Sequence, residues 1–217
     1  MTDFQSEREA MVERQILRRG IGEPHILDAF REVPREEFIG AGYAHLAYGD
    51  HPLPIAAGQT ISQPYIVGLM IEAAEIGAGD RVLEVGSGSG YAAALISRIA
   101  AKVVGIERQP ELVDLARERL ARMGYGNVEI VEADGTAGWP AGAPYDAILA
   151  AASGSHVPQP LIDQLAAGGS LVMPIGQPGG VQRLVKVTKR ADARMERSDL
   201  GAVRFVPLIG EEGWKDG

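Results

Sequence analysis

Three acidic residues in the middle of the chain each stand at or near the end of a short apolar run: Glu84, Glu107 and Asp134. The first of them is followed at once by three alternating glycines: Gly86, Gly88 and Gly90. Glycine permits a sharp backbone turn and lets a ligand approach main-chain groups that a side chain would shield. If the apolar runs are parallel strands, their ends meet at one edge of a sheet, and a nucleotide-like ligand is expected there.

The spacing of the glycines discriminates between ligands. A dinucleotide-binding turn has the pattern G-x-G-x-x-G, whereas the third position here is Tyr91 and the glycine falls one residue early, at Gly90. The sequence contains no phosphate-binding loop of the form G-x-x-x-x-G-K-[ST]. The pattern E-x-G-x-G-x-G suits S-adenosylmethionine, which has no phosphate and offers an amino-acid head group, a ribose and an adenine. A glycine-rich turn also arises for purely structural reasons, and this loop alone leaves that alternative open.

The other two acids extend the same interpretation. Glu107 follows the glycines by about twenty residues, where a carboxylate at the tip of the second strand reaches both ribose hydroxyls. Asp134 follows a third apolar run and can accept a hydrogen bond from the adenine amine, while Gly135 permits a tight turn. Each acid taken singly also fits a solvated loop end. Three acids at three consecutive strand ends favour a common ligand.

Alternating strand and helix patterns from Asp80 onward position these residues. Strands are predicted over residues 81–85, 103–106, 128–131, 145–150 and 170–175, and helices over 91–100, 111–123 and 159–166. Such alternation predicts a mostly parallel, doubly wound α/β sheet with right-handed crossovers. A closing antiparallel pair of strands is predicted over 183–188 and 202–208, with residues 192–199 as its polar turn.

Helices are also predicted ahead of the sheet, over residues 3–19, 24–34 and 64–74. We therefore divide the chain into an N-terminal helical extension with a loop, residues 1–78, and an α/β ligand-binding domain, residues 79–217. At 217 residues the two parts are expected to form a single compact unit.

Composition narrows the class of protein. The formal net charge of -8 argues against a nucleic-acid-binding surface, and we interpret the basic residues within 186–190 as one exposed strand edge. The chain has no cysteine, its four histidines lack metal-ligand spacing, and no run is apolar and long enough to cross a bilayer. Residues 1–8 are charged and lack the apolar core of a signal peptide. We expect a cytoplasmic monomer that binds no metal, nucleic acid or membrane.

A loop over residues 52–65, just ahead of the sheet, is the remaining candidate for chemistry. It is polar and rich in glycine and proline, and ordering such a loop is costly unless it binds something. The alternative is that Ser62 and Gln63 only cap the helix that begins at Pro64.

The sequence resembles the protein-L-isoaspartate O-methyltransferases over nearly its whole length. The loop Gly58-Gln-Thr-Ile-Ser-Gln-Pro-Tyr-Ile-Val67 is similar to the signature loop of that family. Further similar segments follow the family's order: 19–21, 33–35, 52–55, 83–91, 133–135, 143–146, 164–169 and 205–208. The resemblance implies a Rossmann-like methyltransferase fold with an N-terminal helical extension and antiparallel C-terminal strands. It implies methyl transfer from S-adenosylmethionine to the α-carboxylate of L-isoaspartyl residues in damaged proteins, whose esters then revert through a succinimide.

The resemblance also assigns roles to residues of this chain. Ser62 is expected to orient the acceptor carboxylate with Thr60 as a supporting donor, and Ile61, Pro54, Ile55 and Val206 are expected to contact the substrate. The cofactor-binding residues are expected to be Glu84, Gly86, Ser87, Gly88, Glu107, Arg108, Asp134 and Gly135, with backbone amides of the glycine loop facing the methionine carboxylate.

This assignment agrees with the chemistry of the acceptor. A carboxylate is already ionised near neutral pH, so no strong general base is required. A neutral hydroxyl orients it without the ground-state stabilisation that an arginine would bring. Two other functions stay open: a methyltransferase of the same fold acting on RNA or a small metabolite, and a module that binds isoaspartyl peptides without catalysis.

Overall fold

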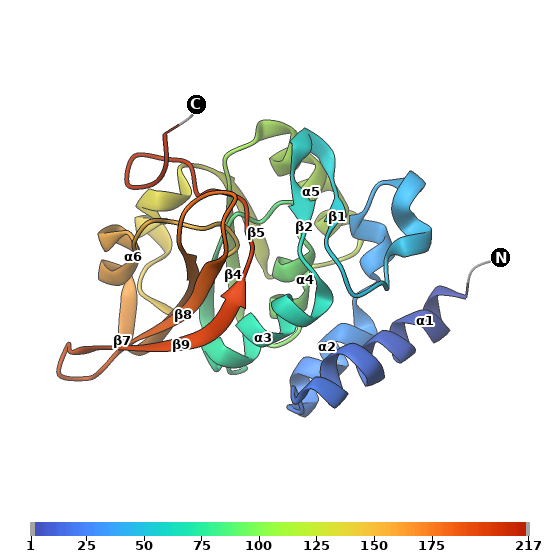
Figure 1. Cartoon of the computed structure of the whole chain (residues 1–217), viewed down its shortest axis with the longest axis horizontal. Coiled ribbons are helices and arrows are strands. Elements are labelled where there is room, and N and C mark those ends of the chain that lie inside the picture. The colour runs from blue at the N-terminus through green and yellow to red at the C-terminus, as the bar shows by residue number, and fades with distance from the viewer. Residues whose placement is uncertain (1–2, 216–217) are drawn as a thin grey trace.

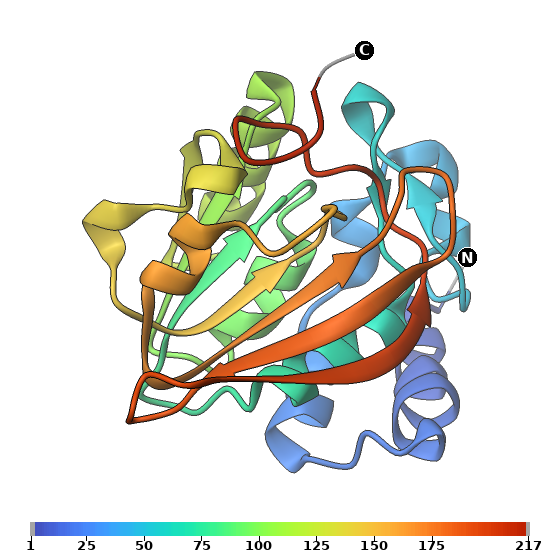
Figure 2. The same cartoon turned by 60° about the vertical axis from the view of Figure 1, so that its left-hand side comes forward.

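A seven-stranded sheet with the order β5-β4-β3-β6-β7-β8-β9 forms the centre of the computed structural model, which describes residues 3–215 (Figures 1 and 2). Residues 1, 2, 216 and 217, the outer ends of the expected two-part division, lie outside the described residues. Neighbouring strands from β5 to β7 are parallel, and β8 and β9 continue the sheet in antiparallel fashion. The strands are β3 (Arg81–Val85), β4 (Lys102–Glu107), β5 (Val128–Glu132), β6 (Tyr145–Ala150), β7 (Leu165–Ile175), β8 (Gln182–Lys189) and β9 (Met195–Val203).

Helices cover both faces of the sheet. One apolar cluster joins the N-terminal helices to α3, α4, α5 and one sheet face, and a second cluster on the opposite face includes Leu161 of α6. The α-helices are α1 (Phe4–Met11), α2 (Pro24–Glu32), α3 (Pro64–Ala74), α4 (Tyr91–Ser97), α5 (Pro110–Arg122) and α6 (Gln159–Asp163). Layers on both sides of a mostly parallel sheet confirm the expected fold class.

Short elements connect these layers. A small antiparallel hairpin of β1 (Leu53–Pro54) and β2 (Thr60–Ile61) precedes α3. The helical turns are η1 (Val12–Ile16), η2 (Leu17–Arg19), η3 (Arg35–Phe38), η4 (Ala41–Leu46), η5 (Ala56–Gly58), η6 (Gly135–Ala137) and η7 (Pro140–Gly142). The predicted helix over 3–19 is one helical stretch. After Met11 it continues as a π-helical turn, η1, and then as a 3₁₀ turn, η2.

The predicted C-terminal strands need correction. The last strand is β9, so the prediction of a strand over 202–208 with a turn over 192–199 is wrong. Most of β9 is exposed at the edge of the sheet, and its polar residues gave no apolar signal. The strand β8 carries the basic cluster but is interior, so the edge interpretation of that cluster is also wrong. Lys186 pairs with Glu75 at 2.9 Å, which accounts for one of these cations.

Candidate active site

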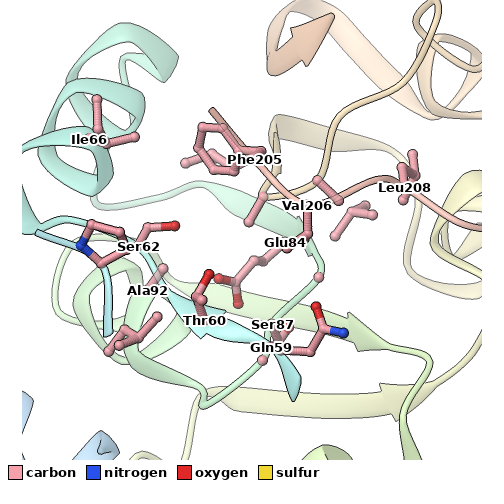
Figure 3. A pocket seen from close by; sticks show the side chains of 18 of the residues that line it. Gln59, Thr60, Ser62, Ile66, Glu84, Ser87, Ala92, Phe205, Val206 and Leu208 are labelled. Atoms are coloured by element: carbon pink, nitrogen blue, oxygen red, sulfur yellow. The ribbon is translucent and has the colours of Figure 1, made fainter. Parts of the chain in front are cut away.

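A cavity of about 990 Å³ lies where β3 and β4 end, between the loop that follows β2 and the segment that follows β9 (Figure 3). Figure 2 shows the β1–β2 hairpin and that C-terminal segment at the same edge of the sheet. Of the predicted site residues, those that line the cavity are Thr60, Ile61, Ser62, Glu84, Gly86, Ser87, Gly88, Glu107, Arg108, Gly135 and Val206. The structure therefore brings most of the predicted donor and acceptor residues to one chamber.

The glycine-rich loop after β3 forms the floor of this cavity. Its backbone turns with φ values of 83° at Gly86, 51° at Gly88 and 85° at Gly90, which L side chains rarely adopt. The amides of Gly86 and Ser87 donate to the carbonyl of Ile106 at 2.8 and 3.0 Å, so they join β3 to β4.

The amide of Gly88 is also occupied, because it donates to Glu107 at 2.9 Å. All three amides thus donate to protein acceptors in this structure, and the expectation that they face a ligand carboxylate stays a prediction from the sequence. Gly86 and Gly88 also shape the cavity, since neither carries a side chain that would occupy it.

Sequence reasoning missed a glycine that this loop requires. A Cβ on Gly105, in the middle of β4, would come within 2.3 Å of Ser87 Oγ and 2.6 Å of Ile130 Cδ1. The glycine loop can lie against β4 only because this position has no side chain. A lone glycine inside an apolar strand signals such a close approach, although it does not identify the neighbour.

Glu84 is the buried acid of the cavity. Only 2% of the residue is exposed, and its Oε2 has no hydrogen-bond partner among the described residues. Burial raises the pKa of Glu84 to about 8, with a smaller opposing effect from the Ser87 hydroxyl and a further increase from the Glu107 charge. An unpaired buried carboxylate oxygen that borders a cavity fits a cationic ligand group such as an α-ammonium.

Glu107 ends β4 with both oxygens fixed by the backbone. Oε2 accepts from Gly88, and Oε1 accepts from the amides of Arg108 and Gln109 at 2.8 and 3.0 Å. The residue is 6% exposed and borders the cavity. Because a carboxylate oxygen can accept more than one hydrogen bond, a carboxylate held in this way can still accept from ribose hydroxyls.

Asp134 is placed differently from the expectation. Its Oδ1 accepts from the amide and the hydroxyl of Thr136, and its Oδ2 accepts from the amide of Glu211 at 2.8 Å. It lines a second cavity of about 510 Å³, which shares Arg108 and Ile209 with the large one. The structure therefore gives Asp134 a definite role in anchoring the C-terminal segment, and only Gly135 borders the main cavity.

The strand β2 and the residue that follows it, Ser62, supply the hydroxyl wall. Along the extended chain Thr60 and Ser62 face the cavity, and Ile61 between them is 5% exposed and also packs in the core. The side chains of Thr60 and Ser62 appear together in Figure 3, and within residues 3–215 neither hydroxyl has a hydrogen-bond partner. Both are therefore available to a ligand.

The capping alternative for this loop is wrong. The N-cap of α3 is Gln63, and no side chain makes a capping hydrogen bond there. Gln63 instead donates to Asp50 Oδ1 at 2.7 Å. Of the two other predicted substrate contacts in this region, Pro54 is exposed on β1 outside the cavity lining, and Ile55 packs toward Gly88.

Opposite the hydroxyls lies the extended segment 204–207, which carries Val206 (Figure 3). Two residues that sequence reasoning missed hold its backbone, Gln182 through its side chain and Ser153 through its backbone amide. The Gln182 amide accepts from Phe205 N at 2.7 Å and donates to Phe205 O at 3.2 Å, as a neighbouring strand would. Ser153 N donates to Val206 O at 2.8 Å. A glutamine directly before the predicted strand was the signal that sequence reasoning could have used. Gln182 is only 1% exposed, and a polar side chain buried to this extent needs hydrogen-bond partners.

Comparison with known proteins decides the family. The profile of the family described as Protein-L-isoaspartate(D-aspartate) O-methyltransferase (PCMT) matches residues 6–213. This chain belongs to that family. A relative named protein-L-isoaspartate O-methyltransferase 1, from Rhodopseudomonas palustris (strain HaA2), is 54% identical over 213 residues, which cover 98% of this chain and 87% of the relative.

Solved structures agree with the family assignment. A protein-L-isoaspartate O-methyltransferase superposes with a TM-score of 0.85 at 31% identity, over 94% of this chain and 66% of that one. A putative protein-L-isoaspartate O-methyltransferase from Plasmodium falciparum has a TM-score of 0.80 at 27% identity and covers 96% of this chain and 99% of its own. The Plasmodium protein was crystallised with S-adenosyl-L-homocysteine. The resemblance inferred from the loop motifs is thereby confirmed.

Proposed function

We propose that this chain transfers a methyl group from S-adenosylmethionine to the α-carboxylate of L-isoaspartyl residues in damaged proteins, within the large cavity. Family membership supports the reaction and the methyl donor. One observation supports the location above all others. The unpartnered hydroxyls of Thr60 and Ser62 border the same chamber as the buried acids Glu84 and Glu107.

The donor half of the cavity fits S-adenosylmethionine. This cofactor supplies an electrophilic methyl on a sulfonium when it is bound. Glu84 would accept from the α-ammonium, since its unpaired oxygen is buried and borders the cavity. Glu107 would accept from the ribose hydroxyls, and Gly135 would leave room for the adenine. Arg108 would lie beside the ribose, and it lines both the large cavity and the second one.

The acceptor half orients an oxygen that is already nucleophilic. Ser62 would donate a hydrogen bond to one oxygen of the substrate carboxylate, with Thr60 as a second donor, and leave the other oxygen in line with the methyl. Ile61 and Val206 would limit access of water. Opposite charges on acceptor and donor decrease together as the transition state forms. A dry site with neutral donors therefore favours the reaction, and most of the rate gain comes from alignment.

The decisive experiment supplies labelled S-adenosylmethionine with a matched pair of peptides, one isoaspartyl and one aspartyl. We expect methyl incorporation into the isoaspartyl peptide alone, as an ester that releases methanol in mild alkali. A methylated product stable to alkali would indicate an RNA or metabolite methyltransferase. Peptide binding without incorporation would indicate a binding module.

The variant Ser62→Ala tests the role of the hydroxyl. We expect unchanged affinity for S-adenosylhomocysteine and a strong loss of turnover, because the hydroxyl contacts only the acceptor. Unchanged turnover on the isoaspartyl peptide would remove Ser62 from the mechanism.

We also propose that the chain acts as a monomer, as expected from the sequence. Size-exclusion chromatography with light scattering tests this. Among residues 3–215, no helix is long and apolar enough to cross a membrane. The cytoplasmic location stays a prediction from the sequence.

A further inference from the structure

Arg35 is a buried arginine that the reaction described above does not use. Arg35 is the first residue of η3, and its relative solvent accessibility is 0%. Among residues 3–215, no carboxylate forms an ion pair with it. Its Nη1 is buried without a hydrogen-bond partner. Burying a cation without a carboxylate partner lowers stability, and an apolar side chain of similar length would fill the same space at a lower cost. Packing alone therefore does not explain an arginine here.

The contacts of Arg35 point to the acceptor loop. Its Nη2 donates to the carbonyl oxygen of Ser62 at 2.8 Å, and its Nε donates to the carbonyl oxygen of Ala47, also at 2.8 Å. The planar guanidinium fixes the angle between these two bonds, so the backbone of Ser62 is held relative to the N-terminal extension.

The same guanidinium touches the donor side. It lies over the ring of Tyr91 at 4.8 Å from the ring centroid, and Tyr91 is the first residue of α4, directly after the glycine loop. The Tyr91 ring borders the cavity and packs edge-on against Phe38 at 5.5 Å. One side chain thus joins the backbone of Ser62 to the helix that follows the donor loop.

We propose that Arg35 is the positioning residue that fixes Ser62 relative to the methyl donor. It touches neither substrate nor cofactor. The inference rests on the proposed role of Ser62. A displacement of about 1 Å at a reacting group lowers a rate by roughly 100-fold, so loss of this tie is expected to affect turnover more than binding.

The test is a double-mutant cycle in the full-length protein. The variants are Ser62→Ala, Arg35→Lys, Arg35→Met and the two double variants, assayed with isoaspartyl peptide at saturating S-adenosylmethionine. We expect Arg35→Met to lower kcat by roughly 10- to 100-fold and Arg35→Lys by less, while the Kd for S-adenosylhomocysteine changes by less than about threefold. We expect kcat of each double variant to be close to that of Ser62→Ala alone. Both changes remove the same interaction, between a positioned Ser62 hydroxyl and the substrate, so their losses should not add.

A matched control separates positioning from general loosening. Arg8, also in the N-terminal extension, donates to the carbonyl of Arg31 at 3.1 Å and to the Tyr48 hydroxyl at 2.8 Å and pairs with Glu36, but among residues 3–215 it makes no hydrogen bond to Ser62. Arg8→Met is expected to lower Tm while kcat, measured well below Tm, stays within about twofold of the unmodified protein.

Three results would overturn the proposal for Arg35: additive losses in the cycle, a lower Tm without loss of kcat, or an equal loss of donor affinity. If Arg35→Met does not fold, the cycle with Arg35→Lys decides alone. Failure of the proposed function is distinguishable, because the unmodified protein would then leave the isoaspartyl peptide unmethylated. Failure of the Ser62 role would appear as full activity of Ser62→Ala.

Discussion

Glu84 allows a quantitative test of how the donor site is built. Burial raises its pKa from 4.5 to about 8, so the folded protein without ligand holds a proton that the unfolded chain has released. At about 1.4 kcal/mol per pKa unit, the shift corresponds to roughly 5 kcal/mol of lost stability once the carboxylate is ionised in both states. Because the folded state binds more protons, the free energy of unfolding falls as pH rises from about 4.5 through about 8.

The variant Glu84→Gln removes this titration. We expect the unmodified protein to lose several kcal/mol of stability between about pH 5 and about pH 8 relative to the variant. All other titrating groups are shared, so the difference between the two urea-unfolding series isolates Glu84. Equal pH slopes for the two proteins would refute the buried-acid interpretation.

Ligand binding provides an independent measurement on the same residue. A ligand ammonium favours the charged carboxylate, so binding of S-adenosylhomocysteine near neutral pH should release a fraction of a proton from Glu84. Calorimetry in two buffers of different ionisation enthalpy measures that release. Glu84→Gln should show less proton release and weaker binding by about 1–3 kcal/mol. Equal release from both proteins would contradict the proposed ammonium contact.

Two further predictions concern the donor site. Glu107→Ala should weaken S-adenosylhomocysteine binding by about 1–3 kcal/mol through lost charged hydrogen bonds, and calorimetry that shows no loss would overturn its placement at the ribose. Gly105→Ala should destabilise the protein by about 1–3 kcal/mol and weaken the same ligand, since its Cβ would lie 2.3 Å from Ser87 Oγ. Gly79→Ala is the control, because a Cβ there meets no atom within 4 Å. Urea unfolding compares the two alanine variants, and similar losses in both would argue against the steric explanation.

The parallel half of the fold could be predicted because its central strands are buried on both faces and therefore largely apolar. The run from Val82 to Val85 is such a strand, with Glu84 as its one polar residue, and the glycines after it marked the ligand-binding edge. The edge strand β9 could not be found in this way, because its exposed residues are as polar as a turn. It forms an antiparallel hairpin with β8, and no apolar alternation marks its side of the pairing.

In the candidate site, too, the features that local sequence encodes could be predicted, and those that depend on residues distant in sequence could not. Glu84 and Glu107 were predictable because the position of a residue at a strand end depends on local sequence. The protein partners of the glycine-loop amides and of the Asp134 carboxylate could not be predicted, because Ile106 and Glu211 are distant from them in sequence. The contact between Arg35 and Ser62 spans 27 residues, and no local pattern reveals it.

The two walls that face each other across the cavity are far apart in the sequence, one in its first third and the other near residue 206. One is the stretch around Thr60, and the other is the stretch around Val206, held by Gln182 and Ser153. During synthesis the glycine turn and its parallel strands emerge well before the second wall exists. A growing or C-terminally shortened chain would therefore have a partial donor site and no enclosed acceptor chamber. A protein that acts on damaged chains thus becomes competent only when its own folding is complete.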